Sequence, residues 1–210
     1  MVFDDAETDR RGVKPLGDIA AEEVLRANMY GLLALLLRDV PDVDMLAALA
    51  ALPHDDTEMG HALGALADAT RRSTRADIED EFHNLFVGVG SAELTPYASY
   101  YLTGFMYEKP LAALRRALAD LGIARAEGVA EPEDHIAALC ETMCALILGR
   151  FGPPATAAVQ RAFFEAHIAP WAERFFTDLQ TAAGAQFYAV VGRVGNVFMQ
   201  IETQAFEMAV

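Results

Sequence analysis

The sequence predicts an all-α protein: a single globular, bundle-like helical domain of about eight to ten helices. Hydrophobic residues recur at intervals of three and four along most of the chain, whereas no stretch of useful length alternates as a β-strand does. Glycine, proline and helix-capping residues separate the hydrophobic segments. With 210 residues, of which 53% are hydrophobic, the chain can bury one sizeable core.

The first part of the chain, residues 1–17, is polar and without periodicity, so we expect a disordered or loosely ordered tail. The helical domain then covers residues 18–210. Capping residues, prolines and glycines bound four predicted helices in its first half, at about residues 18–40, 42–52, 57–72 and 73–87.

Residues 88–109 form one long segment that is neither clearly helical nor extended, and such segments are usually functional or disordered. Its many aromatic residues argue against disorder. Tyrosine combines apolar area with a hydroxyl, so Pro96, Tyr97, Ser99 and Tyr100 are consistent with a binding groove, and equally with simple burial of the loop. The segment is also a plausible hinge, which leaves both a monomer and a domain-swapped dimer open.

The second half predicts five more helices, at about residues 110–121, 132–148, 153–169, 170–183 and 185–205. Pro132 suits the first position of its helix, which would place Glu133 and Asp134 in the first turn, near the positive end of the dipole. Together with Glu131 and His135, they form an acidic, histidine-bearing helix start. His135 should be mostly neutral at pH 7 beside that positive end.

The composition restricts the class of protein. The formal net charge of −15 disfavours nucleic acid and anionic membranes as partners. The longest apolar run, residues 29–37, is too short for membrane insertion. Cys140 and Cys144 lie four residues apart on one predicted helix, which suits a reducing compartment better than a disulfide framework. The Arg10–Arg11 pair is not followed by an apolar region, so we do not interpret it as an export signal.

An enzyme is the first alternative: a helical metal-dependent hydrolase using Asp134, His135 and Glu131. The adjacent side chains of Asp134 and His135 would diverge by about 100° on a helix. Cys140 and Cys144 lie in an apolar stripe, where cysteine behaves as a small hydrophobic residue. Because no catalytic motif is present, we expect no catalytic residues, metal or cofactor. A structural subunit whose loop serves only for assembly is the other alternative.

Three motifs together resemble the TorD/DmsD family, over about residues 20–205. They are Leu85-Phe86-Val87-Gly88, the stretch from Pro96 to Leu102, and Glu131-Pro132-Glu133-Asp134-His135. The resemblance implies an all-helical cytoplasmic chaperone. Its partners would be the twin-arginine signal peptide and the apo-protein of an exported molybdenum-containing oxidoreductase, whose export it delays until the cofactor is inserted.

The resemblance also implies a binding surface, which falls on Leu85, Phe86, Pro96, Tyr97, Ser99, Pro132, Asp134 and His135. Tyr97 stands where some relatives have tryptophan. Tyr100 extends the aromatic groove for the apolar part of a signal peptide, and Glu131 adds a carboxylate for its guanidinium groups.

Overall fold

The computed structural model describes residues 19–88, 92–125, 128 and 131–208, so the predicted tail at residues 1–17 lies outside the described residues. The described residues form ten α-helices and one π-helical turn, which confirms the predicted all-α fold. They are α1 (Ala21–Arg38), α2 (Val43–Ala50), α3 (Glu58–Arg72), α4 (Arg75–Phe82), the π-helix η2 (His83–Val87), α5 (Ala98–Thr103), α6 (Lys109–Asp120), α7 (Ile136–Leu148), α8 (Ala157–His167), α9 (Ala172–Thr181) and α10 (Phe187–Met208).

Several helices begin where a capping side chain satisfies their first free N–H groups. Asp42 and Thr57 accept hydrogen bonds at the starts of α2 and α3, and Thr156 does so for α8. Thr74 and Asp77 form a reciprocal capping box at the start of α4. The local sequence therefore sets these boundaries to within a few residues.

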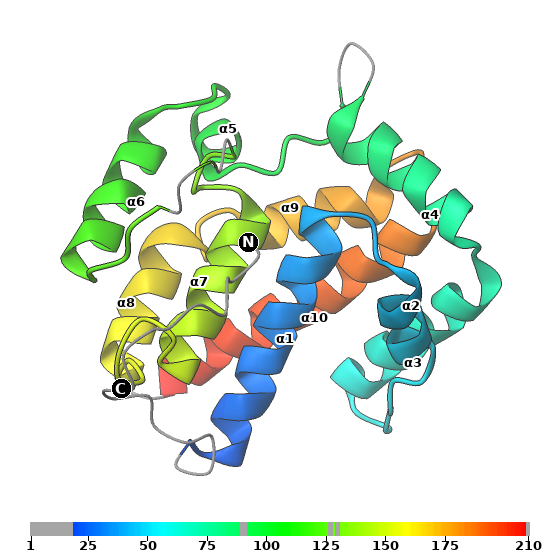
Figure 1. Ribbon diagram of the computed structural model, residues 1–210, viewed down its shortest axis with the longest axis horizontal. Helices are drawn as coiled ribbons and strands as arrows, with labels where there is room; N and C mark the ends of the chain where they lie inside the picture. The colour runs from blue at the N-terminus through cyan, green and yellow to red at the C-terminus, as the bar shows by residue number, and fades with distance from the viewer. Residues whose placement is uncertain (1–18, 89–91, 126–127, 129–130, 209–210) are drawn as a thin grey trace.

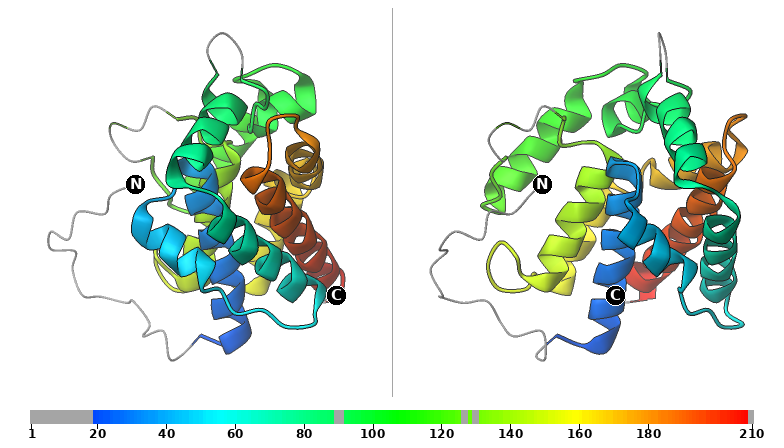
Figure 2. Two further views of the ribbon diagram at one scale, coloured as in Figure 1. Left: turned by 90° about the vertical axis from the view of Figure 1, so that its right-hand side faces the viewer. Right: turned by 45° about the vertical axis from the view of Figure 1, so that its right-hand side comes forward.

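α1 lies between two groups of helices, with α6, α7 and α8 on one side and α2, α3 and α4 on the other (Figure 1). It packs mainly along α7, while α10 packs against α9 and α3 (Figure 2). The α9 side of the contact with α10 is aromatic and aliphatic. Its aromatic residues Trp171, Phe175 and Phe176 are fully buried or nearly so. None of the described helices combines the length and the hydrophobicity needed to cross a membrane.

Two predictions about helix boundaries were wrong. Residues 98–103, inside the segment expected to lack regular structure, form α5. The helix expected at Pro132 begins only at Ile136, with His135 as its N-cap, so Glu133 and Asp134 are not in its first turn. The structural reason is that these residues form a separate turn and take part in contacts with α5 and α6.

Candidate functional site

Two segments that the sequence separates by more than thirty residues meet in an isolated antiparallel bridge between Tyr97 and His135. The Ala98 N–H donates to the carbonyl of Asp134 at 3.0 Å, and the Ile136 N–H donates to the carbonyl of Pro96 at 2.9 Å. We call residues 96–99 and 131–136 the junction. It brings together most of the site residues that the sequence predicts.

Asp134 joins the two segments through its side chain as well. Its Oδ2 atom accepts hydrogen bonds from the Ser99 N–H at 2.8 Å and the Ser99 hydroxyl at 2.6 Å. Helix α5 has no side-chain cap of its own at Tyr97, so Asp134 supplies that cap from across the junction. Asp134 is 1% exposed, and its Oδ1 atom has no hydrogen-bond partner among the described residues.

His135 caps the next helix. Its Nδ1 atom accepts from the Ala137 N–H at 3.1 Å, which requires Nδ1 to be unprotonated. Burial, together with the nearby positive charge of Arg38, lowers the pKa of His135 to about 4. The ring is therefore neutral at pH 7, as the sequence predicts, and it packs edge-on against Tyr97 with the centroids 5.0 Å apart.

Glu131 is the exposed acidic residue of the junction. Its carboxylate accepts a hydrogen bond from the half-buried Tyr97 hydroxyl, and Arg125 donates to its backbone carbonyl at 3.0 Å. Burial and the bond to Glu131 raise the pKa of Tyr97 well above its usual range, so the hydroxyl stays a donor. The exposed carboxylate remains within reach of a guest cation.

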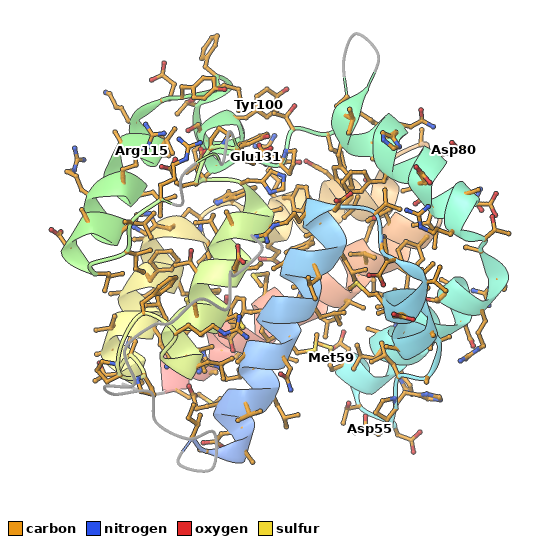
Figure 3. All side chains as sticks on the ribbon, viewed as in Figure 1. Asp55, Met59, Asp80, Tyr100, Arg115 and Glu131 are labelled. Carbon is orange, nitrogen blue, oxygen red and sulfur yellow. The ribbon has the colours of Figure 1, made fainter. Side chains whose placement is uncertain are left out.

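A group of exposed apolar side chains follows the junction on α5 and the turn after it. We call this group the α5 patch, and its members are Tyr100 (44% exposed), Leu102 (44%), Phe105 (70%) and Tyr107 (71%). Of this group, only Tyr100 is predicted from the sequence as a site residue. Figure 3 shows Tyr100, Glu131 and Arg115 in the same region of the molecule, around α5 and α6. Exposed apolar groups of this kind, bordered by polar residues, often mark binding surfaces.

A cavity of about 380 Å³ lies on the α7 side of the junction. Among the described residues, its lining carries four arginines and three glutamates, which are Arg38, Arg115, Arg125, Arg150, Glu131, Glu133 and Glu141. Arg115 bonds to both oxygens of Glu133 at 2.9–3.2 Å, and Arg38 pairs with Glu141. Burial alone would raise the pKa of Glu133, but the hydrogen-bonded Arg115 guanidinium holds that pKa below its usual range. With His135 neutral, the described lining is net positive.

Leu85 and Phe86 lie apart from these contacts. Leu85 is fully buried, and its carbonyl accepts from the Leu94 N–H at 2.9 Å, near the start of the segment that leads to the junction. Phe86 is partly buried and packs edge-on against Phe82 and Tyr188, with centroids 5.1 and 5.4 Å apart. Both residues therefore face the core around α4 and α10.

No group of three or more metal-ligating side chains occurs within the described ranges. Cys140 and Cys144 are free and buried, and burial raises the pKa of both thiols. Their environment is that of core residues.

Comparison with known proteins gives a consistent result. The model of the nitrate reductase delta subunit family matches residues 52–177. The chaperone protein TorD of Vibrio atlanticus is 26% identical over 175 residues, which cover 77% of this chain and 81% of that protein. TorD of Vibrio cholerae is 24% identical over 162 residues, covering 74% and 73%. A crystal structure described as a redox enzyme maturation protein from Archaeoglobus fulgidus aligns with a TM-score of 0.56 and 21% identity, over 84% of this chain and 94% of that one.

The helical fold and these relatives define the class: a chaperone of the TorD type, and not an enzyme. The chain belongs to the nitrate reductase delta subunit family, whose model matches more than half of its length.

Proposed function

We propose that this chaperone acts in the cytoplasm on an exported molybdenum-containing oxidoreductase. It binds the twin-arginine signal peptide and the apo-protein of that client, assists cofactor insertion, and delays export until maturation. One observation carries the proposal: an exposed carboxylate, Glu131, lies at a junction that continues into the exposed α5 patch.

The chemistry of this surface suits such a peptide. A twin-arginine signal combines two guanidinium groups with an apolar segment. Carboxylates pair with guanidinium groups through charge-assisted hydrogen bonds, and apolar helices or extended segments dock on aromatic surfaces. The net charge of −15 adds a general attraction for a cationic guest.

Burial divides the predicted binding residues into two roles. Tyr97, Tyr100 and Glu131 have accessible surface and contact the peptide in this proposal. The remaining predicted residues are mostly or fully buried and position the contacting ones, and these are Leu85, Phe86, Pro96, Ser99, Pro132, Asp134 and His135.

The hydrolase alternative finds no support. A hydrolase would need Asp134 and His135 to act on one substrate atom. Instead, Oδ2 of Asp134 caps α5 and Nδ1 of His135 caps α7, so the two side chains are held by two different helices. The named relatives are chaperones.

Calorimetric titration with a synthetic twin-arginine signal peptide tests the proposal. The double variant Tyr100→Ser and Phe105→Ser should weaken binding by roughly ten- to a hundredfold, since each ring loses about 1.5–3 kcal/mol of burial at most. Glu131→Gln should also weaken binding, and more so at low salt.

The matched control is Leu25→Ser, which removes an equally exposed apolar side chain from α1 (66% exposed) and should leave the affinity unchanged. If wild-type protein shows no saturable binding, or if Leu25→Ser weakens binding as much as the patch variant does, the proposal is wrong. Binding of the client to a surface unaffected by all these changes would favour the assembly-subunit alternative.

A further inference from the structure

The cavity of about 380 Å³ on the α7 side of the junction has room for a guest of its own. Its volume lies in the range of about 300–1,000 Å³ that is typical of ligand sites. The apolar part of its lining includes Leu118, Ile123, Ala138 and Phe151, and the described charged part is net positive. Such a site suits a guest that combines an apolar side chain with negative charge.

Arg150 and Phe151, which follow α7, offer both kinds of contact. Two of the other lining arginines already pair with glutamates of the lining. Arg150 is exposed, and within the described ranges its guanidinium forms no ion pair or hydrogen bond. The Phe151 ring is 42% exposed. A guest carboxylate could therefore pair with Arg150 while an apolar side chain packs beside Phe151.

The chain itself contains a segment with this chemistry, at residues 2–9. They read Val-Phe-Asp-Asp-Ala-Glu-Thr-Asp, so two hydrophobic residues precede four carboxylates, with no basic residue among them. Residues 10–18, by contrast, carry three basic residues and one acidic residue. This second part would meet like charges at the cavity, so complementarity favours residues 2–9. Both parts lie outside the described residues.

Residues 2–9 can reach the cavity from the start of α1. Helix α1 packs along α7 (Figure 1), and its last residue, Arg38, lines the cavity. The 18 residues of α1 span about 27 Å. The chain between Phe3 and α1, residues 4–18, spans up to about 50 Å when it is extended. Even the far end of α1 therefore lies within reach of Phe3.

We propose that residues 2–9 dock in the 380 Å³ cavity of their own chain, with the Phe3 ring among its apolar residues and Asp4 and Asp5 at Arg150. Because the segment is tethered to α1, its effective concentration at the cavity is high, and individually weak contacts are enough to hold it. The described lining contains no member of the α5 patch, so docking leaves that patch open. The inference does not depend on the proposed function.

Hydrogen exchange of the full chain, followed by mass spectrometry at low salt, tests this docking. The backbone amides of residues 4–9 should exchange at least about threefold more slowly than those of a synthetic peptide of residues 2–9. Phe3→Ser and Arg150→Glu should each return them to the rate of the peptide. Arg116→Glu is the matched control, because Arg116 is an exposed arginine of α6 outside the lining, and the slow exchange should persist in it.

An exchange of charges separates direct pairing from a general electrostatic effect. Asp4→Arg with Asp5→Arg should abolish the slow exchange in an otherwise unchanged chain and restore it in Arg150→Glu. Circular dichroism should show every variant folded. Exchange of wild type at the rate of the peptide, or slow exchange that survives both Phe3→Ser and Arg150→Glu, would overturn the proposal. Slow exchange that disappears on dilution would assign the cavity to the same segment of a second copy and would also overturn docking within one chain.

Discussion

His135 shows how much a single side chain contributes at this junction. Its backbone takes part in the bridge to Tyr97, and its ring caps α7 through the Ala137 N–H. The capping role requires the neutral ring, because a protonated Nδ1 cannot accept a hydrogen bond. The residue therefore links the structure of the candidate site to pH.

The stability of the fold should fall with acidification as a result. The folded-state pKa of His135 is about 4, against about 6.5 in an unfolded chain, so the unfolded state binds the proton first as the pH falls. The contribution of His135 is complete above about pH 6.5 and is lost progressively toward pH 4, amounting to about 3 kcal/mol. Urea denaturation between pH 4.5 and 7.5 measures it.

The matched variant is His135→Asn, because asparagine is a good N-cap that does not titrate in this range. Its free energy of unfolding should change less with pH than that of wild type, and the difference isolates His135 from the other titrating groups. Parallel curves for the two proteins would show that His135 does not titrate as its environment indicates.

Among the helices, the start of α10 depends on a residue of α4. The carboxylate of Glu81 accepts hydrogen bonds from the N–H groups of Gln186, Phe187 and Tyr188, at 2.8, 3.1 and 2.6 Å. A carboxylate at a helix N-terminus satisfies free donors and interacts favourably with the helix dipole. Glu81 therefore connects α10, the longest helix of the described chain, to α4.

Glu81→Gln should lower the free energy of unfolding by about 1–2 kcal/mol, because the amide accepts fewer and weaker hydrogen bonds. Hydrogen exchange at the first turn of α10 should accelerate as well. Glu79→Gln is the control: within the described residues, the Glu79 side chain forms an exposed pair with Arg75, and its loss should change stability by less than about 0.5 kcal/mol. Similar effects of the two variants would contradict the assigned role of Glu81.

The sequence predicts those helices whose start signals are local. Asp42 and Thr57 cap the helices that directly follow them, and α2 and α3 begin as expected. Helix α5 could not be predicted in this way, since its cap comes from Asp134. The same contact explains the error at α7: Asp134 is held by α5 and is not available for the first turn of its own helix.

The candidate site was predictable only in part for a similar reason. The motifs located the junction, because their residues lie close together in sequence on each side. They did not show which side chains are exposed. Asp134 and Ser99 are buried, whereas Phe105 and Tyr107 are exposed and follow α5, a helix that the sequence does not predict. Exposure depends on how α5 and α6 pack, and a pattern of residues within one segment does not report it.

For the whole molecule, a buried ion pair ties α1 to α10. Arg26 bonds to both carboxylate oxygens of Glu202 at 2.7 Å, and Tyr30 donates to the same carboxylate at 2.8 Å. Glu202 is 0% exposed, and Arg26 also contacts Glu23 and Gln160, so the network reaches α8. A charge buried this deeply is tolerated because it is paired and hydrogen-bonded.

Arg26→Met should therefore destabilise the protein by about 3–5 kcal/mol, since it leaves the Glu202 carboxylate buried without its cation. The double variant Arg26→Met and Glu202→Leu should recover much of this loss, because it removes both charges. Urea denaturation of the three proteins measures the coupling. A loss below about 1 kcal/mol in Arg26→Met would mean that water reaches the carboxylate in the folded protein.

The bridge between Tyr97 and His135 holds together two points of the chain, one directly before α5 and the other directly before α7. Helices α5 and α6 and the exposed patch lie in the chain between these two bridged residues. A segment whose two ends are already held together can change length or sequence with little effect on the rest of the chain. The exposed positions of this part can thus vary among homologues, whereas its buried residues Ala98, Leu114 and Leu118 pack in the common core and must change together with the surrounding helices.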